Sequence, residues 1–312
     1  MLKHGVYFFY WHDVSNDKTI PNGIRTSPKR FESEIKFIHR NFQIVTIKEA
    51  IDSIKKIKII KIKKPLAVLC FDDGFKSLQQ NVEPILSKSN IPFTMFLNTA
   101  FLDQTHLSES ILCEYISRFM KEEDIKNNFK HVNFKKPLWS LLKKTSSKNQ
   151  LDKLQKSVSK SWIKNNIYLS WDDLEKFNNQ LVTFGNHTSH HLWLANLNKI
   201  EQEKEIKHSH LKLKKLSQYI KLLAIPFGSD DSYNNETLSL VKKYSDSILI
   251  KATGSINHKS EDGLLKIERI GMSNNKPNIE RHIRNRLKEK SIIYKIRNNL
   301  IKIFYKTKLL RQ

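Results

Sequence analysis

The chain is poor in cysteine and has no long apolar run at its amino terminus. Only Cys70 and Cys113 are present among 312 residues, which excludes a disulfide framework, and Cys70 lies in an apolar segment where it is expected to pack as a small hydrophobic residue. The apolar stretch that ends at Trp11 is too short to cross a membrane, and it lacks the small-residue cleavage site of a signal peptide. We therefore interpret it as the first strand of the fold and predict a cytoplasmic location.

Acidic residues are also scarce, with 31 Asp and Glu against 55 Lys and Arg and a net charge of +24. Such a charge informs about partners and solubility more than about fold. Nucleic acid, an anionic membrane face, and anionic glycans or lipid-linked sugar phosphates all fit it, and so does a general compositional bias towards lysine. Because no segment resembles a nucleic-acid recognition module, nucleic acid is the least favoured partner.

A chain of this length can bury a substantial core, and one barrel-sized domain is favoured over two. A helix is predicted to begin at Ser27, a strand at 43–45, and a second helix after the capping box of Thr46 and Glu49. This alternation of helices and strands predicts an α/β architecture. Later strands are predicted at 66–71, 92–97, 181–184, 222–226, 247–250 and 265–270.

Residues 101–169 contain no glycine and alternate apolar and charged residues at helical spacing. We interpret them as a helical insertion after the 92–97 strand and not as a separate catalytic unit. Beyond this segment, Ser170 and Asp173 have the spacing of a capping box. Asp172 and Asp173 raise the alternative of a second metal site, but acids at a helix start explain them better.

Two adjacent carboxylates, Asp72 and Asp73, follow the apolar strand predicted at 66–71, and Gly74 allows a sharp turn after them. Neighbouring residues at a strand end point in different directions. One carboxylate can therefore bind a metal while the other faces a substrate. A strand capped by an acidic turn fits the same residues.

A second polar cluster, at 185–191, follows the strand predicted at 181–184. The spacing of His187 and His191 places both imidazoles on one side of a helical turn or a compact loop. With Asp73 as an oxygen ligand they could hold zinc and leave positions open for water and substrate. A histidine pair alone often lies on the surface or in the core without binding a ligand. Since both clusters end strands, we favour a single shared metal site.

These motifs have a family resemblance. Phe71-Asp72-Asp73-Gly74 and His187-Thr188-x-x-His191 resemble the first two motifs of the NodB-type polysaccharide deacetylases, carbohydrate esterase family four. Tyr10-x-His12-x-Val14 resembles the opening element of the Tyr-His branch, and Pro226-Phe227-Gly228 resembles the third motif. The likeness spans most of residues 5–272, and it implies a distorted (β/α) barrel that hydrolyses N-acetyl groups on sugars with a bound metal. We predict a barrel at 1–277 and a basic tail at 278–312.

The resemblance also implies roles for the residues of the first two motifs. Asp73, His187 and His191 are expected to hold a divalent metal, with zinc as the expected ion. Asp72 is expected to act as the general base that removes a proton from water. Thr188 fits the small hydroxyl residue with which the family steadies its histidine loop.

The third motif is where the chain departs from the family. The backbone N–H of Phe227 is expected to donate to the oxyanion of the reaction, and Pro226 and Gly228 are predicted to contact the substrate. The family commonly has an arginine two residues before the proline, where it orients the catalytic aspartate; here that residue is Ala224. We predict that Arg269 in a late strand supplies the guanidinium, as an arginine of the Tyr-His branch does.

The general acid is a second departure, because the chain lacks a late Leu-x-x-His element. His12 and His258 are the candidates. We favour His12, since the end of its strand should face the rim of the barrel, although a structural role at the rim fits His12 equally. His258 is interpreted as a loop histidine.

From 278 onwards the chain is strongly basic, with apolar residues at helical spacing. Such a helix can lie on an anionic membrane surface. A solvated tail and a helix packed on the barrel fit the pattern equally. A cytoplasmic chain with this tail favours a nucleotide-linked or lipid-linked sugar as the substrate.

We therefore predict a metal-dependent N-deacetylase that acts on an N-acetylated glycan, a glycolipid or a lipid-linked sugar. Two alternatives remain open. One is an amidohydrolase for a small non-sugar amide, and the other is a catalytically silent protein that binds glycans or membranes.

Overall fold

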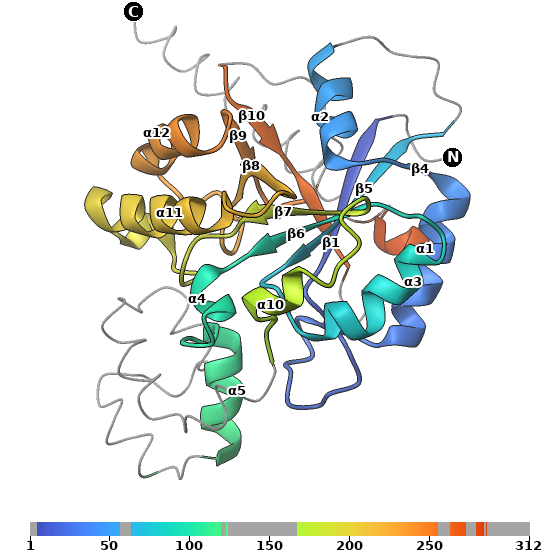
Figure 1. Cartoon of the computed structure of the whole chain (residues 1–312), viewed down its shortest axis with the longest axis horizontal. Coiled ribbons are helices and arrows are strands. Elements are labelled where there is room, and N and C mark those ends of the chain that lie inside the picture. The colour runs from blue at the N-terminus through green and yellow to red at the C-terminus, as the bar shows by residue number, and fades with distance from the viewer. Residues whose placement is uncertain are drawn as a thin grey trace, which may run out of the picture.

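A parallel sheet of nine strands runs through the middle of the protein, with helices around its outside (Figure 1). The computed structural model describes residues 5–56, 64–119, 123, 167–254, 263–272, 279–283 and 285. The sheet contains β1 (Val6–Trp11), β4 (Gln43–Ile44), β5 (Leu66–Asp72), β6 (Phe93–Leu97), β7 (Val182–Asn186), β8 (Tyr219–Ala224), β9 (Ile248–Ile250), β10 (Leu265–Ile267) and β11 (Arg269–Gly271). The strands β2 (Asp13–Val14) and β3 (Arg25–Thr26) form a separate parallel pair.

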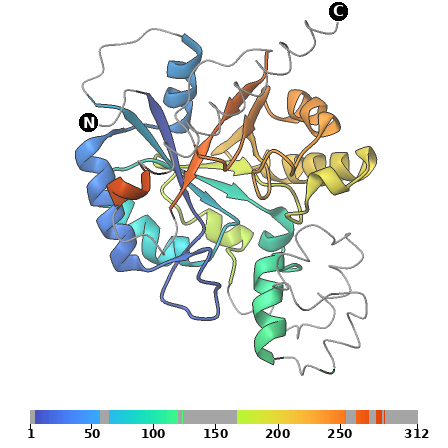
Figure 2. The ribbon, with the colours of Figure 1, turned by 180° about the vertical axis from the view of Figure 1, so that it is seen from behind.

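Helices connect these strands, as the alternating sequence pattern predicted. In both views α1 and α3 lie along one side of the sheet, and α11 and α12 lie along the other (Figures 1 and 2). The α-helices are α1 (Pro28–Asn41), α2 (Ile47–Lys56), α3 (Glu83–Ser87), α4 (Thr99–Leu102), α5 (Glu109–Phe119), α10 (Trp171–Leu174), α11 (Lys199–Leu213) and α12 (Asn235–Tyr244). A π-helical turn, η1 (Leu78–Val82), precedes α3, and a 3₁₀ turn, η2 (Leu194–Asn196), precedes α11.

The two edges of the sheet are joined by one segment of chain. The strand order is β10-β9-β8-β7-β6-β5-β1-β11, so that β10 and β11 lie at opposite ends although only Glu268 separates them. Within the described residues no ladder joins β10 to β11, because the chain passes from one edge to the other at this point. The result is a distorted (β/α) barrel, which confirms the predicted fold class.

Alternation along the strands separates two hydrophobic cores, since successive side chains of a strand point to opposite faces. On β1, Tyr7 and Phe9 pack towards the outer helices, whereas Val6 and Phe8 belong to a core inside the barrel. The interior core also contains Cys70, as expected, and burial raises the pKa of its thiol to about 12. The buried thiol is therefore protonated and packs as an apolar group.

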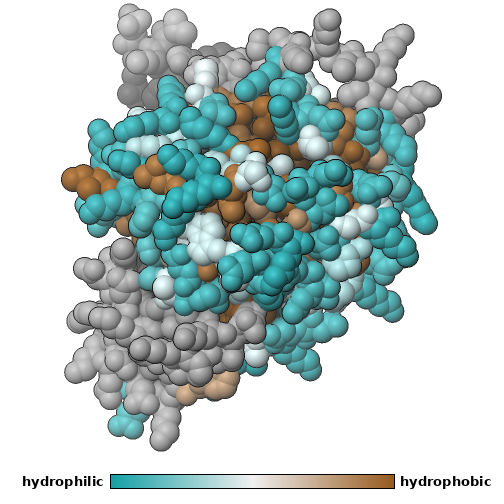
Figure 3. Space-filling view, in the orientation of Figure 1, coloured by the Kyte–Doolittle hydropathy of each residue, from teal (hydrophilic) through white to brown (hydrophobic). Residues whose placement is uncertain are grey.

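Helix α2 covers the end of the barrel at which the strands begin. Its residues Ile47, Ile51 and Ile54 belong to the interior core, and Thr46 and Glu49 form the predicted capping box at its start. Hydrophobic side chains are visible between α2 and β10 in Figure 3. Since α2 occupies this end, the opposite end, where the strands finish, is left for the polar residues that the sequence places there.

Close packing inside the barrel leads to a first prediction. A Cβ on Gly185 of β7 would lie 2.4 Å from Cε1 of Phe96 on the neighbouring strand β6. Gly185→Ala is therefore expected to displace the Phe96 ring and to lower the free energy of unfolding in urea by about 1–3 kcal/mol. Gly23→Ala is the matched control, because its Cβ would meet nothing within 4 Å. Equal stability of the two variants would contradict the prediction.

The predicted strands differ from the observed ones where the backbone turns or bends. The strand predicted at 222–226 spans Tyr219–Ala224, since Pro226 lacks an N–H for the ladder and Phe227 takes a φ of +63°. The single strand predicted at 265–270 is divided into β10 and β11, and the Glu268 side chain between them bonds to Lys251 and Thr253.

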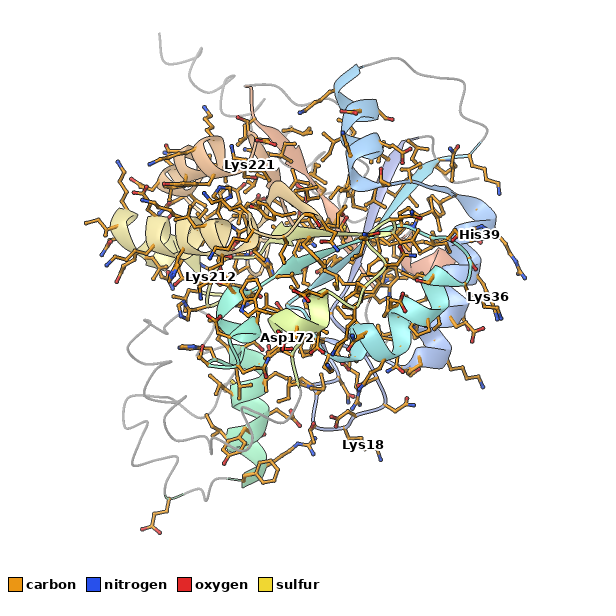
Figure 4. The ribbon with its side chains drawn as sticks, in the orientation of Figure 1. Lys18, Lys36, His39, Asp172, Lys212 and Lys221 are labelled. Atoms are coloured by element: carbon orange, nitrogen blue, oxygen red, sulfur yellow. The ribbon has the colours of Figure 1, made fainter. Side chains whose placement is uncertain are left out.

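The predicted insertion at 101–169 is described at its two ends. It begins with the last residues of α4 and continues into α5, and it returns to the barrel at residue 167. Helix α10 follows it directly. The carboxylate of Asp173 accepts hydrogen bonds from the N–H (3.0 Å) and the hydroxyl (2.9 Å) of Ser170, so this acid starts a helix as expected. Asp172 is exposed on the same helix (Figure 4).

Most of the predicted basic tail at 278–312 lies outside the described residues. In its described part, Ile283 is buried in the outer core and His282 Nε2 donates to the carbonyl of Gly271 at 2.7 Å.

None of the described helices is long and apolar enough to cross a membrane. Several lysines of the barrel, including Lys18, Lys36 and Lys221, extend outwards from the ribbon (Figure 4).

Candidate metal and catalytic site

Asp73, His187 and His191 meet at the end of the barrel where the parallel strands finish. Asp73 Oδ1 lies 3.6 Å from His187 Nε2 and 3.7 Å from His191 Nε2. Within the described residues, this is the one group of His, Cys, Asp and Glu side chains whose candidate ligand atoms lie within 4.8 Å of one another. All three side chains are buried. Asp73 is more than a hundred residues from the histidines in the sequence, and the parallel order of β5, β6 and β7 brings them together.

Hydrogen bonds from side chains hold the loop that carries the histidines. Thr188 and His191 have φ values of +69° and +59°, an uncommon conformation for residues other than glycine. The Thr188 hydroxyl accepts from the N–H of His191 at 3.2 Å, and Asn186 Oδ1 accepts from the N–H of Thr188 at 2.7 Å. Asn98, which follows β6, donates to the carbonyls of His187 and Thr188. The loop is therefore held in its strained form from two neighbouring strands.

The other ring nitrogen of each histidine determines which nitrogen faces Asp73. His187 Nδ1 donates to the carbonyl of Ala224 at 2.8 Å, which leaves the lone pair of Nε2 directed at the cluster. Burial lowers the pKa of His187 to about 4, so this ring is neutral. His191 Nδ1 lies 3.2 Å from Glu109 Oε2. Burial alone lowers the pKa of His191, but Asp73 and Glu109 outweigh it and raise the pKa to about 9. This negative potential also favours a bound cation.

The donor set fits a divalent metal. Asp73 Oδ1 is buried, and it has no hydrogen-bond partner among the described residues. A buried carboxylate oxygen without a partner is costly, and a cation between it and the imidazoles would satisfy it. Two imidazole nitrogens and one carboxylate oxygen are ligands that zinc and similar divalent ions take in hydrolases, with positions left for water and substrate. Asp73, His187 and His191 would hold such an ion.

Asp72 pairs with Arg269, and its Oδ2 also lies 4.0 Å from His187 Nε2. The two side chains form a bidentate ion pair with contacts of 2.6 and 2.8 Å, and both are almost completely buried. Burial raises the pKa of Asp72, but the guanidinium outweighs it and lowers the pKa to about 2. Arg269 is held in turn by the carbonyl of Lys251 at 3.1 Å, and its Cζ lies 4.6 Å from the ring centroid of Tyr10 and 5.3 Å from that of Phe96. Asp72 is thus a buried, ionised and immobilised carboxylate.

The third motif forms a wall beside the histidines. The ring centroid of Phe227 lies 4.7 Å from that of His191 and 4.8 Å from that of Trp193. Phe227 and Gly228 both have a φ of +63°, and a Cβ on Gly228 would lie 2.4 Å from the Cβ of Ala252. Gly228 is therefore needed for close packing of this turn. Its predicted contact with substrate, and that of the buried Pro226, stay predictions.

His12 follows β1 at the same end of the barrel. Its ring centroid lies 5.5 Å from that of Tyr10, it is half-buried, and its charge contributes to the lowered pKa of Asp72. His258, the other candidate acid, lies outside the described residues. The predicted site residues that the structure brings to this end of the barrel are Asp72, Asp73, His187, His191, Phe227, Arg269 and His12.

Sequence reasoning missed two residues of this site. Asn98 holds the histidine loop and Glu109 contacts His191 from α5. Asn98 had a usable signal, because it is a polar residue directly after a predicted buried strand. Glu109 had none, since it lies in a segment that reads as an ordinary charged helix.

The chain is similar in sequence to known proteins. Residues 60–245 match the family model described as polysaccharide deacetylase, so the chain belongs to the polysaccharide deacetylase family. A segment of 109 residues is 29% identical to the Bacillus subtilis (strain 168) protein YxkH; it covers 33% of this chain and only 36% of that protein. The family match confirms the resemblance seen in the motifs, while membership of the Tyr-His branch stays a prediction.

Several solved structures share the fold at low sequence identity. IcaB from Ammonifex degensii has a TM-score of 0.58 at 15% identity over 88% of this chain and 94% of its own. A de-N-acetylase from Aggregatibacter actinomycetemcomitans has a TM-score of 0.58 at 15% identity over 90% and 99% of the two chains. The Streptococcus pyogenes deacetylase PplD in complex with acetate has a TM-score of 0.52 at 17% identity over 88% and 94%. At these identities the likeness shows the fold alone.

Proposed function

We propose that the chain is a metal-dependent hydrolase that removes an N-acetyl group from a sugar. One arrangement carries this proposal: the ion-paired carboxylate of Asp72 lies beside the candidate metal site, with its Oδ2 4.0 Å from His187 Nε2. A buried carboxylate that is kept ionised next to a metal site has the properties of a general base. A protein that only binds glycans or membranes needs no such group, so the arrangement favours an enzyme over the catalytically silent alternative.

Each residue of the candidate site has a separate role in the proposed amide hydrolysis. A bound divalent cation supplies a Lewis acid for the acetamide carbonyl and lowers the pKa of a water molecule. Asp72 accepts a proton from the attacking water, while Arg269 fixes the orientation of this carboxylate. The Phe227 N–H donates to the developing oxyanion. The C–N bond then breaks, and His12 gives a proton to the leaving amine. Acetate and a free amino sugar are the products.

The substrate class is supported by the family and by the chemistry of the fold relatives. The fold relative PplD was solved with acetate, the product expected here, and the Aggregatibacter relative is named a de-N-acetylase. The net charge of +24 supports an anionic substrate such as a lipid-linked or nucleotide-linked N-acetyl sugar. We extend the proposal to a cytoplasmic chain that contacts an anionic membrane through residues 278–312.

Acetate release tests the reaction class. The purified chain is incubated with zinc or cobalt and with three groups of compounds: N-acetylated oligosaccharides, lipid-linked N-acetyl sugars and small acetamides. We expect release from one of the two sugar groups. Turnover of the small acetamides alone would favour the amidohydrolase alternative, and no turnover in any group would favour the silent one.

Metal removal gives a further prediction. Dialysis against a chelator is expected to reduce acetate release to background, because the ligands hold the only Lewis acid of the proposed site. One equivalent of zinc or cobalt is expected to restore it and to raise the midpoint of thermal unfolding, since an ion that binds only the folded state stabilises it. Full activity of the chelated protein, verified metal-free by elemental analysis, would contradict metal dependence.

A further inference from the structure

Glu109 contacts the candidate metal site from a part of the chain that was predicted to be a helical insertion. Its Oε2 lies 3.2 Å from His191 Nδ1, and its side chain is only 7% exposed. In this contact the N–H of the histidine donates and the carboxylate oxygen accepts. His191 Nε2, on the opposite side of the same ring, faces Asp73. Glu109 thus contacts the side of the ligand ring that points away from the metal position.

The position of Glu109 is fixed by contacts at both ends of the insertion. The N–H of Ser108 donates to the hydroxyl of Tyr168 at 3.1 Å, and this hydroxyl donates to Ser108 Oγ at 3.0 Å. The Tyr168 ring packs on Phe101 and Phe75 with centroid distances of 4.4 and 5.0 Å. Phe75 is two residues after Asp73. The entry and the exit of the insertion are therefore tied to each other and to the loop that carries a candidate ligand.

The charged groups around the candidate ligands indicate a role for Glu109 in the metal site. Asp72 and Arg269 form an ion pair and cancel each other. The ring of His187 is oriented by the backbone carbonyl of Ala224, to which its Nδ1 donates at 2.8 Å. Among the described residues, Asp73 and Glu109 are the carboxylates that lie within 4 Å of the His191 ring nitrogens, one at each nitrogen, and both would attract a divalent cation. A carboxylate behind a ligand histidine fixes the ring and increases its basicity.

We propose that Glu109 is a positioning residue of the metal site, which directs His191 Nε2 to the ion and strengthens binding of a divalent cation. This proposal rests on the proposed function, since it requires that Asp73, His187 and His191 hold a metal. It makes the start of the insertion part of the metal centre and not an accessory to the barrel. The ligand concerned is the divalent ion itself, whichever sugar the enzyme accepts.

The test compares Glu109→Gln with Glu205→Gln. Glu205 on α11 is the matched control, because its Oε1 lies 2.7 Å from Nδ1 of His190 and it is equally buried, yet His190 is not part of the metal cluster. The measured quantity is the dissociation constant for zinc, obtained by competition with a chromophoric chelator, together with the absorption spectrum of the cobalt form. We expect E109Q to bind zinc roughly 10- to 100-fold more weakly than wild type and E205Q to bind it as wild type does.

A second variant separates charge from shape. Glu109→Asp keeps the negative charge, and we expect it to bind zinc more tightly than E109Q while metal-free samples of both unfold at similar urea concentrations. Wild-type zinc affinity in E109Q, an equal loss in E205Q, or no advantage of E109D over E109Q would each overturn the proposal. If wild type itself bound neither zinc nor cobalt, the proposed function would fail first, so the two failures are distinguishable.

Discussion

Asp72→Asn is expected to lower kcat for acetate release by roughly 10²- to 10⁴-fold, the contribution typical of a general base. Asparagine keeps the shape of the side chain but cannot accept the proton of the attacking water. The zinc dissociation constant is expected to change little, because Asp72 lies outside the group of candidate ligands. The measurements are steady-state acetate release and a zinc titration of the same samples.

Asp172→Asn is the matched control for this experiment. Asp172 also stands beside a second aspartate, but it is exposed on α10 and is not part of the metal cluster. This variant should keep wild-type kcat. Full activity in D72N would remove Asp72 from the proton transfer. Loss of zinc binding in D72N would instead make it a metal ligand and would require a different base.

The sequence predicted the position of the site because strands and strand ends have local signals. The apolar run at 66–71 followed by Asp72, Asp73 and Gly74 identifies a buried strand and the turn that ends it. A second strand followed by histidines identifies another such end. In a parallel sheet the carboxyl ends of the strands lie at the same end of the sheet. Two local patterns were therefore enough to predict one shared location.

Arg269 was predicted from the family resemblance, and the alternation of the strand predicted at 265–270 agrees with its observed position. Leu265 and Ile267 point into the barrel, and a period of two places Arg269 on the same face as these residues. The sequence could not show the flanking rings of Tyr10 and Phe96, because these come from strands far away in the chain. Local alternation predicts which face a side chain takes, whereas its partners depend on the strand order.

Glu109 was not predictable, and the reason is physical. Glu114 lies on the same helix, is partly exposed and pairs with Arg118 one turn later, which is an ordinary surface contact. Nothing in the local sequence distinguishes Glu109 from Glu114. The difference arises from the contacts of Tyr168 with Ser108, which bring the start of α5 against the histidine loop. Such a contact spans 82 residues and leaves no periodic pattern.

The second large effect is expected for Arg269→Ala, which leaves the carboxylate of Asp72 buried without its partner. Removal of one partner of a buried ion pair typically costs about 3–5 kcal/mol in the free energy of unfolding. Burial, which raises the pKa of Asp72, would then act without the guanidinium that lowers it to about 2 in the wild type. A protonated Asp72 cannot accept a proton, so kcat should fall as far as in D72N. Zinc affinity should persist, since the ligands are untouched.

The pH dependence of the lost stability has a definite sign. In the wild type the folded pKa of Asp72, about 2, lies below its ordinary value of 3.8. The pair therefore stabilises the protein above pH 3.8, and this contribution is lost as the pH falls towards 2. In R269A burial raises the folded pKa of Asp72 above 3.8, so folding at neutral pH requires either a buried charge or the uptake of a proton, and this cost disappears below pH 3.8. The difference in unfolding free energy between wild type and R269A should thus be largest near neutral pH and shrink in acid.

Two further variants separate the charge of Arg269 from its geometry. Arg269→Lys keeps the charge but cannot form two parallel hydrogen bonds, so we expect a stability between those of wild type and R269A and a kcat well below wild type. The double variant D72N/R269A removes both charges, and its loss of stability should be smaller than the sum of the two single losses. The free energy of unfolding in urea is measured for wild type, D72N, R269A, R269K and the double variant. If the losses in the free energy of unfolding were additive, Asp72 and Arg269 would not act as a pair. Other groups would then keep the carboxylate ionised.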